Sequence, residues 1–181
     1  DLVSAGEQVG LSIDYLNLLR SKVELKVEYV NYGSLSGNIQ MGIEQKIDVI
    51  NTLVKNEERQ KHFTFSDPVT SDSVVFYGRV GAQRIENYND LRNKRIGFIK
   101  DHTIPETFKQ NYPDLNYVEF KNNMEVLRAL SANKIDVYPY VTAPIEFHIS
   151  QNKLQGIEVL GDNFIKEKKT LDYRIAVHKE N

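Results

Sequence analysis

The stretch "MEVLRALSANKIDVY", residues 124–138, contains the local signals of an α/β unit. Apolar residues recur from Met124 to Leu130 at the spacing of one helix face, and Asn122 and Asn123 directly before them are N-cap candidates. The helical pattern then gives way to Lys-Ile-Asp-Val, which we interpret as the opening of a strand. The stretch therefore predicts a short helix that leads directly into a strand.

A weak internal repeat extends this pattern to the rest of the chain. "KVEYVNY" (26–32) precedes "MGIEQKIDVI" (41–50), just as "NYVEFKNN" (116–123) precedes the stretch above. Each copy predicts an alternating strand, a short helix and a strand opened by Lys-Ile-Asp-Val. The helix of the first copy is weaker, because Gly37 and Gly42 each lower helix propensity by about 1 kcal/mol relative to alanine. Two similar half-units are predicted.

The segments before each copy fit the same scheme. "LSIDYLNLLRSKV" (11–23) has a broad apolar stripe, which predicts a helix packed on the core, with Ser12 as its N-cap. "KRIGFIKD" (94–101) is typical of a short buried strand, and "TIPETFKQNYP" (103–113) of a helix with Pro105 in its first turn. Strands that alternate with helices favour an α/β fold with mostly parallel sheets.

Two further extended segments, "SVVFYGRV" (73–80) and "DYRIAVHK" (172–179), carry no helix of their own. We expect them to link two α/β lobes as crossover strands, with a ligand-binding cleft between the lobes. The expected division is residues 1–77 plus 166–181 as lobe 1 and residues 78–165 as lobe 2.

The composition excludes several classes of function. The chain has 181 residues, 40% of them hydrophobic, with 23 basic and 25 acidic side chains. A net charge of −2 provides no positive field for nucleic acid. There is no cysteine, and the four histidines lack metal-ligand spacing, so neither a disulfide nor a metal is expected. No cofactor motif and no membrane-spanning run occurs, which leaves a soluble chain or one whose targeting segment was removed.

The stretch "NEERQKHFTFSDP" (56–68) contains the first candidate ligand-binding residues. Asn56 is a candidate cap for a helical turn that starts with Glu57 and Glu58. Arg59 follows, and a guanidinium at this place can bind a carboxylate through two parallel hydrogen bonds. The alternative is an ordinary surface ion pair with the neighbouring glutamates. Phe63 and Phe65 predict a strand that Asp67-Pro68 ends, and Ser66 beside it is a further ligand candidate.

The second lobe provides the other candidates. His102 and Thr103 lie where a helix starts, and the exposed amides of a helix start can bind an anion. Thr103 can equally serve as a simple cap, in a capping box with Glu106. Tyr138 and Tyr140 follow the second Lys-Ile-Asp-Val, where they either line a ligand pocket or pack half-buried.

Several runs together resemble the bacterial family 3 solute-binding proteins, which have the two-lobed type II periplasmic binding, or Venus-flytrap, fold. The runs are "GLSIDYLNLL" (10–19), "KIDVI" (46–50), "ERQKHFTFSDP" (58–68), "YNDLRNKRIGFIKD" (88–101) and "VLRALSANKIDVYPY" (126–140). The resemblance covers about four fifths of the chain, and these runs follow one another in the family's order. The resemblance implies a binding module that closes on its ligand.

The resemblance also assigns roles to particular residues. In amino-acid-binding members, the arginine matching Arg59 holds the ligand α-carboxylate, and the threonine matching Thr103 assists from the second lobe. Other positions depart from the family: Val54 and Asn56 replace two hydroxyl residues, and Val141 replaces the acid that binds the α-ammonium. A buried ammonium without a carboxylate costs several kcal/mol. An acid that lacks the ammonium is therefore the expected ligand, with an empty site as the alternative.

We expect an extracytoplasmic sensor domain, periplasmic or part of an inner-membrane protein such as a histidine kinase. The alternatives are a free receptor of an ABC transporter and a dehydratase-like enzyme on the same fold. No enzymatic activity is expected within this chain. The expected partners are a small carboxylate-bearing ligand and a membrane-spanning signalling segment or permease; a dimer is left open. No cofactor and no nucleic acid is expected.

Overall fold

The computed structural model describes residues 2–4, 7–23, 26–32, 34–100, 102–164 and 170–180. The chain divides into two compact units: unit 1 is Asp1–Thr70 with Asp172–Asn181, and unit 2 is Ser71–Leu171. The chain passes from one unit to the other near the start of β5 (Thr70–Arg79) and again near the start of β10 (Thr170–His178). The sequence analysis places these crossings after residues 77 and 165.

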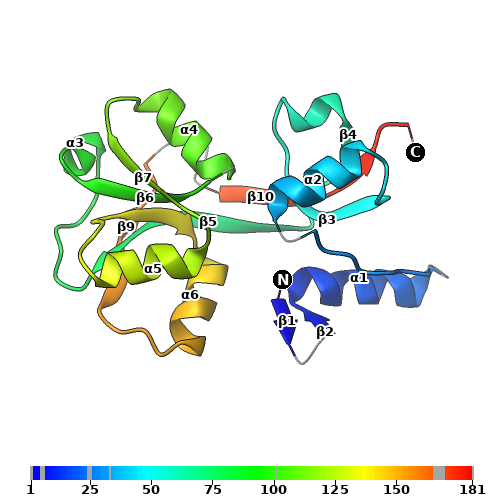
Figure 1. Ribbon diagram of the computed structural model, residues 1–181, viewed down its shortest axis with the longest axis horizontal. Coiled ribbons are helices and arrows are strands. Elements are labelled where there is room, and N and C mark those ends of the chain that lie inside the picture. Colours follow the sequence, from blue (N-terminus) through cyan, green and yellow to red (C-terminus); the bar gives the residue numbers. More distant parts are fainter. Residues whose placement is uncertain are drawn as a thin grey trace. The chain divides into compact units, whose positions relative to one another are not determined.

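Helices and strands alternate along most of the chain, as expected for an α/β protein (Figure 1). The helices are α1 (Leu11–Lys22), α2 (Leu35–Ile43), the 3-10 helix η1 (Arg59–Lys61), α3 (Tyr88–Leu91), α4 (Thr103–Asn111), α5 (Asn123–Ser131) and α6 (Thr142–Gln151). The remaining strands are β1 (Leu2–Ser4), β2 (Glu7–Val9), β3 (Val49–Val54), β4 (Phe63–Phe65), β6 (Arg95–Ile99), β7 (Asn116–Phe120), β8 (Tyr138–Val141) and β9 (Ile157–Asp162).

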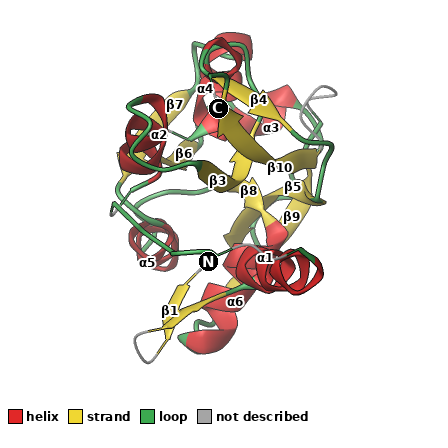
Figure 2. Cartoon of the chain, turned by 90° about the vertical axis from the view of Figure 1, so that its right-hand side faces the viewer, coloured by secondary structure: helices red, strands yellow, loops and turns green. Residues whose placement is uncertain are grey.

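Unit 1 is built around β10, which pairs antiparallel with both β3 and β4 (Figure 2). Its core contains Ile50 and Leu53 of β3, Phe63 of β4 and Ala176 of β10, all buried. The apolar side of α2 packs against this core. Gly42 of α2 permits the close approach, because a β-carbon there would lie 3.0 Å from the Phe63 ring. The glycine that weakens this helix in isolation is therefore required by its packing.

Unit 2 combines parallel and antiparallel pairing. β6 and β7 are parallel, and Val137 just before β8 forms a parallel bridge to Ile96 of β6. β5 pairs antiparallel with β8 and β9, so the sheets contain more antiparallel pairing than expected. Helices cover both faces of β6 (Figure 1). The Phe98 ring lies 5.5 Å from that of Phe108 in α4, and Gly97 allows Val126 of α5 to approach the opposite face.

The secondary structure predicted from the repeat is correct for the second copy and partly wrong for the first. β7, α5 and β8 follow in the expected order, and Asn122 is the cap, since its Oδ1 accepts the Glu125 amide at 3.0 Å. The expected strand over 26–32 is wrong, because these residues form no strand. Alternating side chains require a neighbouring ladder, and no described strand pairs with this segment. Here the amide of Tyr32 instead donates to Asn38 Oδ1, at 2.8 Å.

Two expected helix caps are also wrong. The N-cap of α1 is Gly10, with no side-chain cap bond, and Ser12 lies inside the helix. The N-cap of α4 is His102 rather than Thr103, again without a side-chain cap bond. The expected Thr103–Glu106 capping box rests on side chains outside the described residues. Both helices thus begin one or two residues earlier than the nearest hydroxyl residue suggested, which is the usual uncertainty of a helix end.

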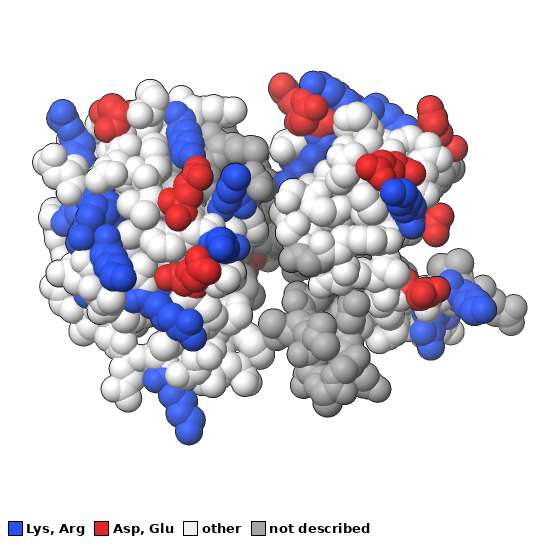
Figure 3. Space-filling model, in the orientation of Figure 1, with Lys and Arg blue, Asp and Glu red and all other residues white. Residues whose placement is uncertain are grey.

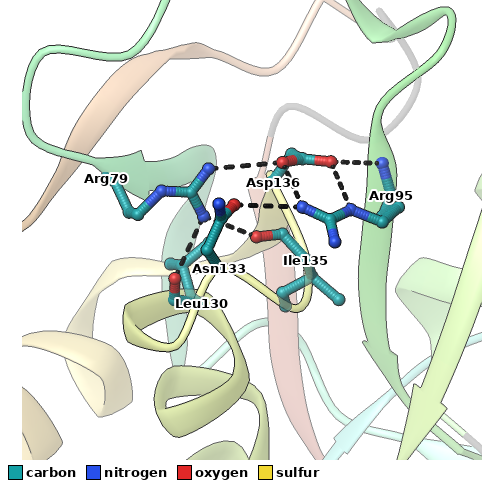
Figure 4. Close-up of polar contacts among 6 residues, drawn as sticks. All are labelled: Arg79, Arg95, Leu130, Asn133, Ile135 and Asp136. Atoms are coloured by element: carbon teal, nitrogen blue, oxygen red, sulfur yellow. Dashed lines mark hydrogen bonds and ion pairs between the residues drawn. The ribbon is translucent and has the colours of Figure 1, made fainter.

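The two Lys-Ile-Asp-Val copies differ in what their aspartate does. Asp136 of the second copy lies between Arg79 and Arg95 (Figure 4). Arg95 Nε and Nη2 each donate to its carboxylate at 2.8 Å, the Arg95 amide donates at 2.9 Å, and Arg79 Nη2 lies at 3.3 Å. These bonds, those from Arg95 above all, hold the pKa of Asp136 well below its usual range. Asp48 of the first copy is exposed.

Arg79 also connects this cluster to α5. Its Nη1 donates to the carbonyls of Leu130 at 3.1 Å and Ile135 at 2.7 Å (Figure 4). Cations near the end of a helix satisfy carbonyls that lack intrahelical partners. Arg79, Asp136 and Arg95 thus fasten the end of β5, the turn after α5 and the start of β6 together, and we call these three residues the Asp136 clasp.

Candidate functional site

In unit 1, the candidate residues lie on the turn that follows β3. Asn56 Oδ1 accepts the Arg59 amide at 2.8 Å, and the Asn56 carbonyl accepts the Gln60 amide at 3.0 Å. Asn56 therefore caps the turn, as its position in the sequence predicts. The cap fixes where η1 begins, and Arg59 is the first residue of η1.

Arg59 is buried rather than solvated. Only 8% of the residue is exposed, and its Nη1 donates to the Val54 carbonyl at 2.7 Å. Glu58 pairs with Lys61, and both of those side chains are exposed. Among the described residues, Arg59 is the only charged residue in the buried core. A guanidinium held this way, with five donors in a rigid plane, has the geometry to bind a carboxylate through two bonds.

Ser66 has a structural role in the same unit. It is exposed, its hydroxyl donates to the Asp67 carbonyl at 2.6 Å, and it accepts the Ile175 amide at 3.1 Å. Its own carbonyl accepts a bond from Arg174 Nη1 at 2.7 Å. These contacts fasten the end of β4 to β10. The expected strand of Phe63 and Phe65 is confirmed as β4.

In unit 2, three candidates lie together: His102 follows the carboxyl end of β6, and Tyr138 and Tyr140 belong to β8. The Tyr140 hydroxyl lies 3.1 Å from His102 Nδ1, and the Tyr140 ring stacks on Tyr138 at 5.0 Å and 22°. The Tyr138 hydroxyl donates to Asn123 Oδ1 at 2.6 Å, and burial raises the pKa of Tyr138 well above its usual value. Tyr138 is therefore a fixed neutral donor, and it positions Tyr140 against His102. The carboxyl ends of parallel strands are where α/β folds bind ligands.

Thr103 follows His102 as the first residue of α4. Its side chain lies outside the described residues, so its role as a ligand contact remains a prediction. The helix itself has nine residues, and its N-terminus lies at the same end of the sheet as His102 and Tyr140.

The sequence missed one acidic side chain near this end of unit 2. Val141 ends β8, is 2% exposed and pairs with Val74 of β5. Directly beyond it, Asp72 Oδ1 accepts the Thr142 hydroxyl at 2.6 Å, and Asp72 Oδ2 accepts the Ala143 amide at 2.9 Å. A carboxylate thus lies at the start of α6, although Val141 provides none. It was missed because Asp72 and Thr142 are far apart in sequence, and only the β5–β8 register joins them.

Neither charged nor metal-ligating side chains indicate a second site among the residues that the structure describes. Both acidic and basic side chains lie on the visible face of each unit (Figure 3). Within the described ranges, no three His, Asp or Glu side chains gather closely enough to hold a metal ion. No helix in those ranges combines the length and apolar character needed to cross a bilayer.

Residues 2–139 match the family described as bacterial extracellular solute-binding proteins, family 3. The chain belongs to this family. The family's members are extracellular solute-binding proteins. This description agrees with the expected location outside the cytoplasm, and with the expectation of a binding protein rather than an enzyme. The membership also accounts for the fold, since the match runs through both units.

Known relatives include sensors and binding proteins. The chain is 22% identical over 159 residues to the virulence sensor protein BvgS of Bordetella pertussis, covering 87% of this chain and 13% of that protein. It therefore spans only a small part of that relative. A histidine kinase sensor domain similar to periplasmic binding proteins has a TM-score of 0.88, 18% identity, and coverage of 99% of this chain and 77% of the other. An ancestral arginine-binding protein bound to arginine has a TM-score of 0.83, 27% identity, and coverage of 97% and 77%.

Proposed function

We propose that the chain is the ligand-binding part of an extracytoplasmic sensor, which closes around a small carboxylate-bearing solute and signals across the membrane. Arg59 holds the solute's carboxylate from unit 1. His102, Thr103 and Tyr140 contact the solute from unit 2, with Tyr138 as their support. In this proposal, units 1 and 2 act as the two lobes of the family's fold, and β5 and β10 are the crossover strands.

The buried guanidinium of Arg59 is the observation that carries this proposal. Burying an arginine costs free energy unless its donors are satisfied, and the turn after β3 fixes its position through Asn56 and Val54. Charge-assisted, bidentate hydrogen bonds to a carboxylate are among the strongest polar contacts, above all where water is excluded. Similarity to the virulence sensor BvgS supports the sensing role.

Replacing Arg59 is expected to weaken solute binding strongly. Isothermal titration of amino acids and organic acids should identify a binding carboxylate, and Arg59→Ala should weaken it at least about 100-fold, because the buried bidentate pair is lost. Arg59→Lys keeps the positive charge but not the planar guanidinium, so the affinity of this variant should lie between those of the wild type and Arg59→Ala. The thermal unfolding temperature gives an independent readout, because saturating ligand should raise it.

Arg84→Ala is the matched control, because Arg84 is an exposed arginine with no hydrogen bond or ion pair among the described residues. Its affinity should equal that of the wild type. Wild-type affinity in Arg59→Ala, with circular dichroism showing that it is folded, would contradict the proposed carboxylate role.

The signalling part of the proposal has a separate test. The coding sequence that follows residue 181 should encode a membrane span and a cytoplasmic signalling domain. A stop codon soon afterwards, next to permease genes, would instead identify a free receptor of an ABC transporter.

A further inference from the structure

The imidazole of His102 is held in a defined orientation at the start of α4. His102 is the N-cap residue of this helix, but its side chain makes no cap bond. Its Nδ1 lies instead 3.1 Å from the Tyr140 hydroxyl, and the two rings lie 5.8 Å apart at an angle of 46°. His102 is only half-buried, so part of its ring can contact a solute.

Buried side chains fix the Tyr140 hydroxyl in turn. Tyr140 is 7% exposed, and its ring stacks on that of Tyr138, which is fully buried. The Tyr138 hydroxyl donates its one hydrogen to Asn123 Oδ1 at 2.6 Å. A chain of contacts therefore runs from the first residue of α5 through β8 to the start of α4. Packing alone does not require a half-buried histidine to have one ring nitrogen oriented in this way.

The contact with Tyr140 determines what the other ring nitrogen of His102 can do. A neutral imidazole has one donor and one acceptor nitrogen, and a tyrosine hydroxyl has one hydrogen to donate. When Tyr140 donates to Nδ1, the proton of the neutral ring is on Nε2, which is then a donor. A protonated imidazole donates from both nitrogens, so Nε2 is a donor in that state as well. The strongest partner for such a donor is an anionic oxygen.

Asp72 does not face this pair of side chains. Residues 72 and 74 of β5 lie on one face of the sheet, and Val74 pairs with Val141, the neighbour of Tyr140. Alternation along β8 places Tyr140 on the opposite face. Both Asp72 oxygens also accept bonds from the start of α6, which they cap. Asp72 therefore provides no carboxylate to His102 or to a cationic group beside it.

We propose that His102 donates from Nε2 to a second carboxylate of the solute, and that Tyr140 positions the ring for this bond. The inference rests on the proposed function, in which the guanidinium of Arg59 binds the first carboxylate through two parallel bonds. It narrows the solute class to dicarboxylates. The positive end of α4, which begins directly after His102, stabilises the same negative charge.

Dicarboxylates and their monoamides test this assignment, because an amide replaces one carboxylate at nearly the same size. Titration calorimetry would compare succinate with succinamate, glutarate with glutaramate, and adipate with adipamate. In at least one pair, the wild type should bind the dicarboxylate about tenfold more tightly or better, since one charge-assisted hydrogen bond contributes about that factor. Arg59→Ala should weaken the binding of both members of that pair.

His102→Phe keeps an aromatic ring beside Tyr140 but has no ring nitrogen. It should remove the preference for the dicarboxylate, while the affinity for the monoamide stays close to that of the wild type. His148→Phe is the matched control, because His148 lies on α6, outside the proposed solute contacts, and this variant should keep the preference. Circular dichroism would show that both variants are folded.

Tyr140→Phe tests the positioning role, since it keeps the buried ring and removes only the hydroxyl. The preference for the dicarboxylate should fall to an intermediate value. At about pH 8, where histidine is ordinarily neutral, nitrogen NMR should place the proton of His102 on Nε2 in the wild type and show a mixture of tautomers in Tyr140→Phe. A purely structural role for Tyr140 would leave the preference and the tautomer unchanged.

Two results would overturn the assignment and leave the role of Arg59 intact. One is an undiminished preference for the dicarboxylate in His102→Phe, and the other is a wild type that binds every monoamide as tightly as its dicarboxylate. A wild type that binds no carboxylate at all would overturn the proposed function together with this inference.

Discussion

Asp136→Asn is expected to lower the free energy of unfolding by about 3 kcal/mol at neutral pH. The substitution leaves Arg79 and Arg95 facing each other without the carboxylate that accepts their bonds. Breaking a buried pair by removing one partner typically costs about 3–5 kcal/mol. The side chain of Arg95 is 38% exposed, so solvent screening places the effect at the low end. Urea unfolding monitored by circular dichroism measures it.

The same effect should depend on pH in a defined direction. The pKa of Asp136 is lower in the folded state than the usual unfolded value of about 3.9. Its contribution is therefore fully present above about pH 4 and is lost as the pH falls further towards the folded value. The gap between wild type and Asp136→Asn should narrow below about pH 4. Asp48→Asn is the matched control, because Asp48 has the same motif but is exposed, and it should change stability by less than about 0.5 kcal/mol. Equal changes in the free energy of unfolding for Asp136→Asn and Asp48→Asn would contradict the stabilising role of the Asp136 clasp.

Gly161→Ala is expected to destabilise the chain by about 3 kcal/mol or more. Gly161 of β9 pairs with Phe76, and a β-carbon at Gly161 would lie 2.1 Å from the Ile85 carbonyl oxygen. The Ile85 amide also donates to the Leu160 carbonyl at 3.1 Å, so both sides of the clash are hydrogen-bonded backbone. Backbone cannot rotate away as a side chain can, so the substitution must shift β9 or the loop against it.

The control for this substitution is Gly156→Ala. Gly156 has a φ of +77°, but no atom lies within 4 Å of its would-be β-carbon. Alanine there should cost only the left-handed backbone penalty, about 1 kcal/mol. Thermal and urea unfolding of both variants compare the two costs. A Gly161→Ala protein as stable as Gly156→Ala would show that Ile85 can move aside.

Sequence signals correctly predicted the elements that depend on residues close to one another in the chain. α5 has its cap, its apolar face and its following strand within residues 122–141, and all three are found. β6 and α4 follow in the same way from a short apolar run and a helix start. The strand expected over 26–32 is different, since alternation specifies a face but not a partner. A strand exists only where another strand accepts its hydrogen bonds.

The candidate site shows the same division. Asn56 and Arg59 are three residues apart, and the sequence was sufficient to predict the turn that joins them. Asp72 and Thr142 are seventy residues apart, so no spacing rule connects them. Likewise, nothing in the sequence distinguishes Asp48 from Asp136, since the motif around them is identical. Their different burial follows from Arg79 and Arg95, which only the folded sheet brings to Asp136.

The division of the chain has a consequence for its synthesis on the ribosome. Unit 2 is one continuous segment that ends at Leu171, whereas unit 1 also needs the later residues Asp172–Asn181. β10 pairs with both β3 and β4, and its Ala176 lies in the core of unit 1. The emerging chain can therefore complete unit 2 while unit 1, although made first, still lacks its central strand. Unit 1 can therefore complete its core only after β10 has been synthesised, although most of its residues precede unit 2 in the chain.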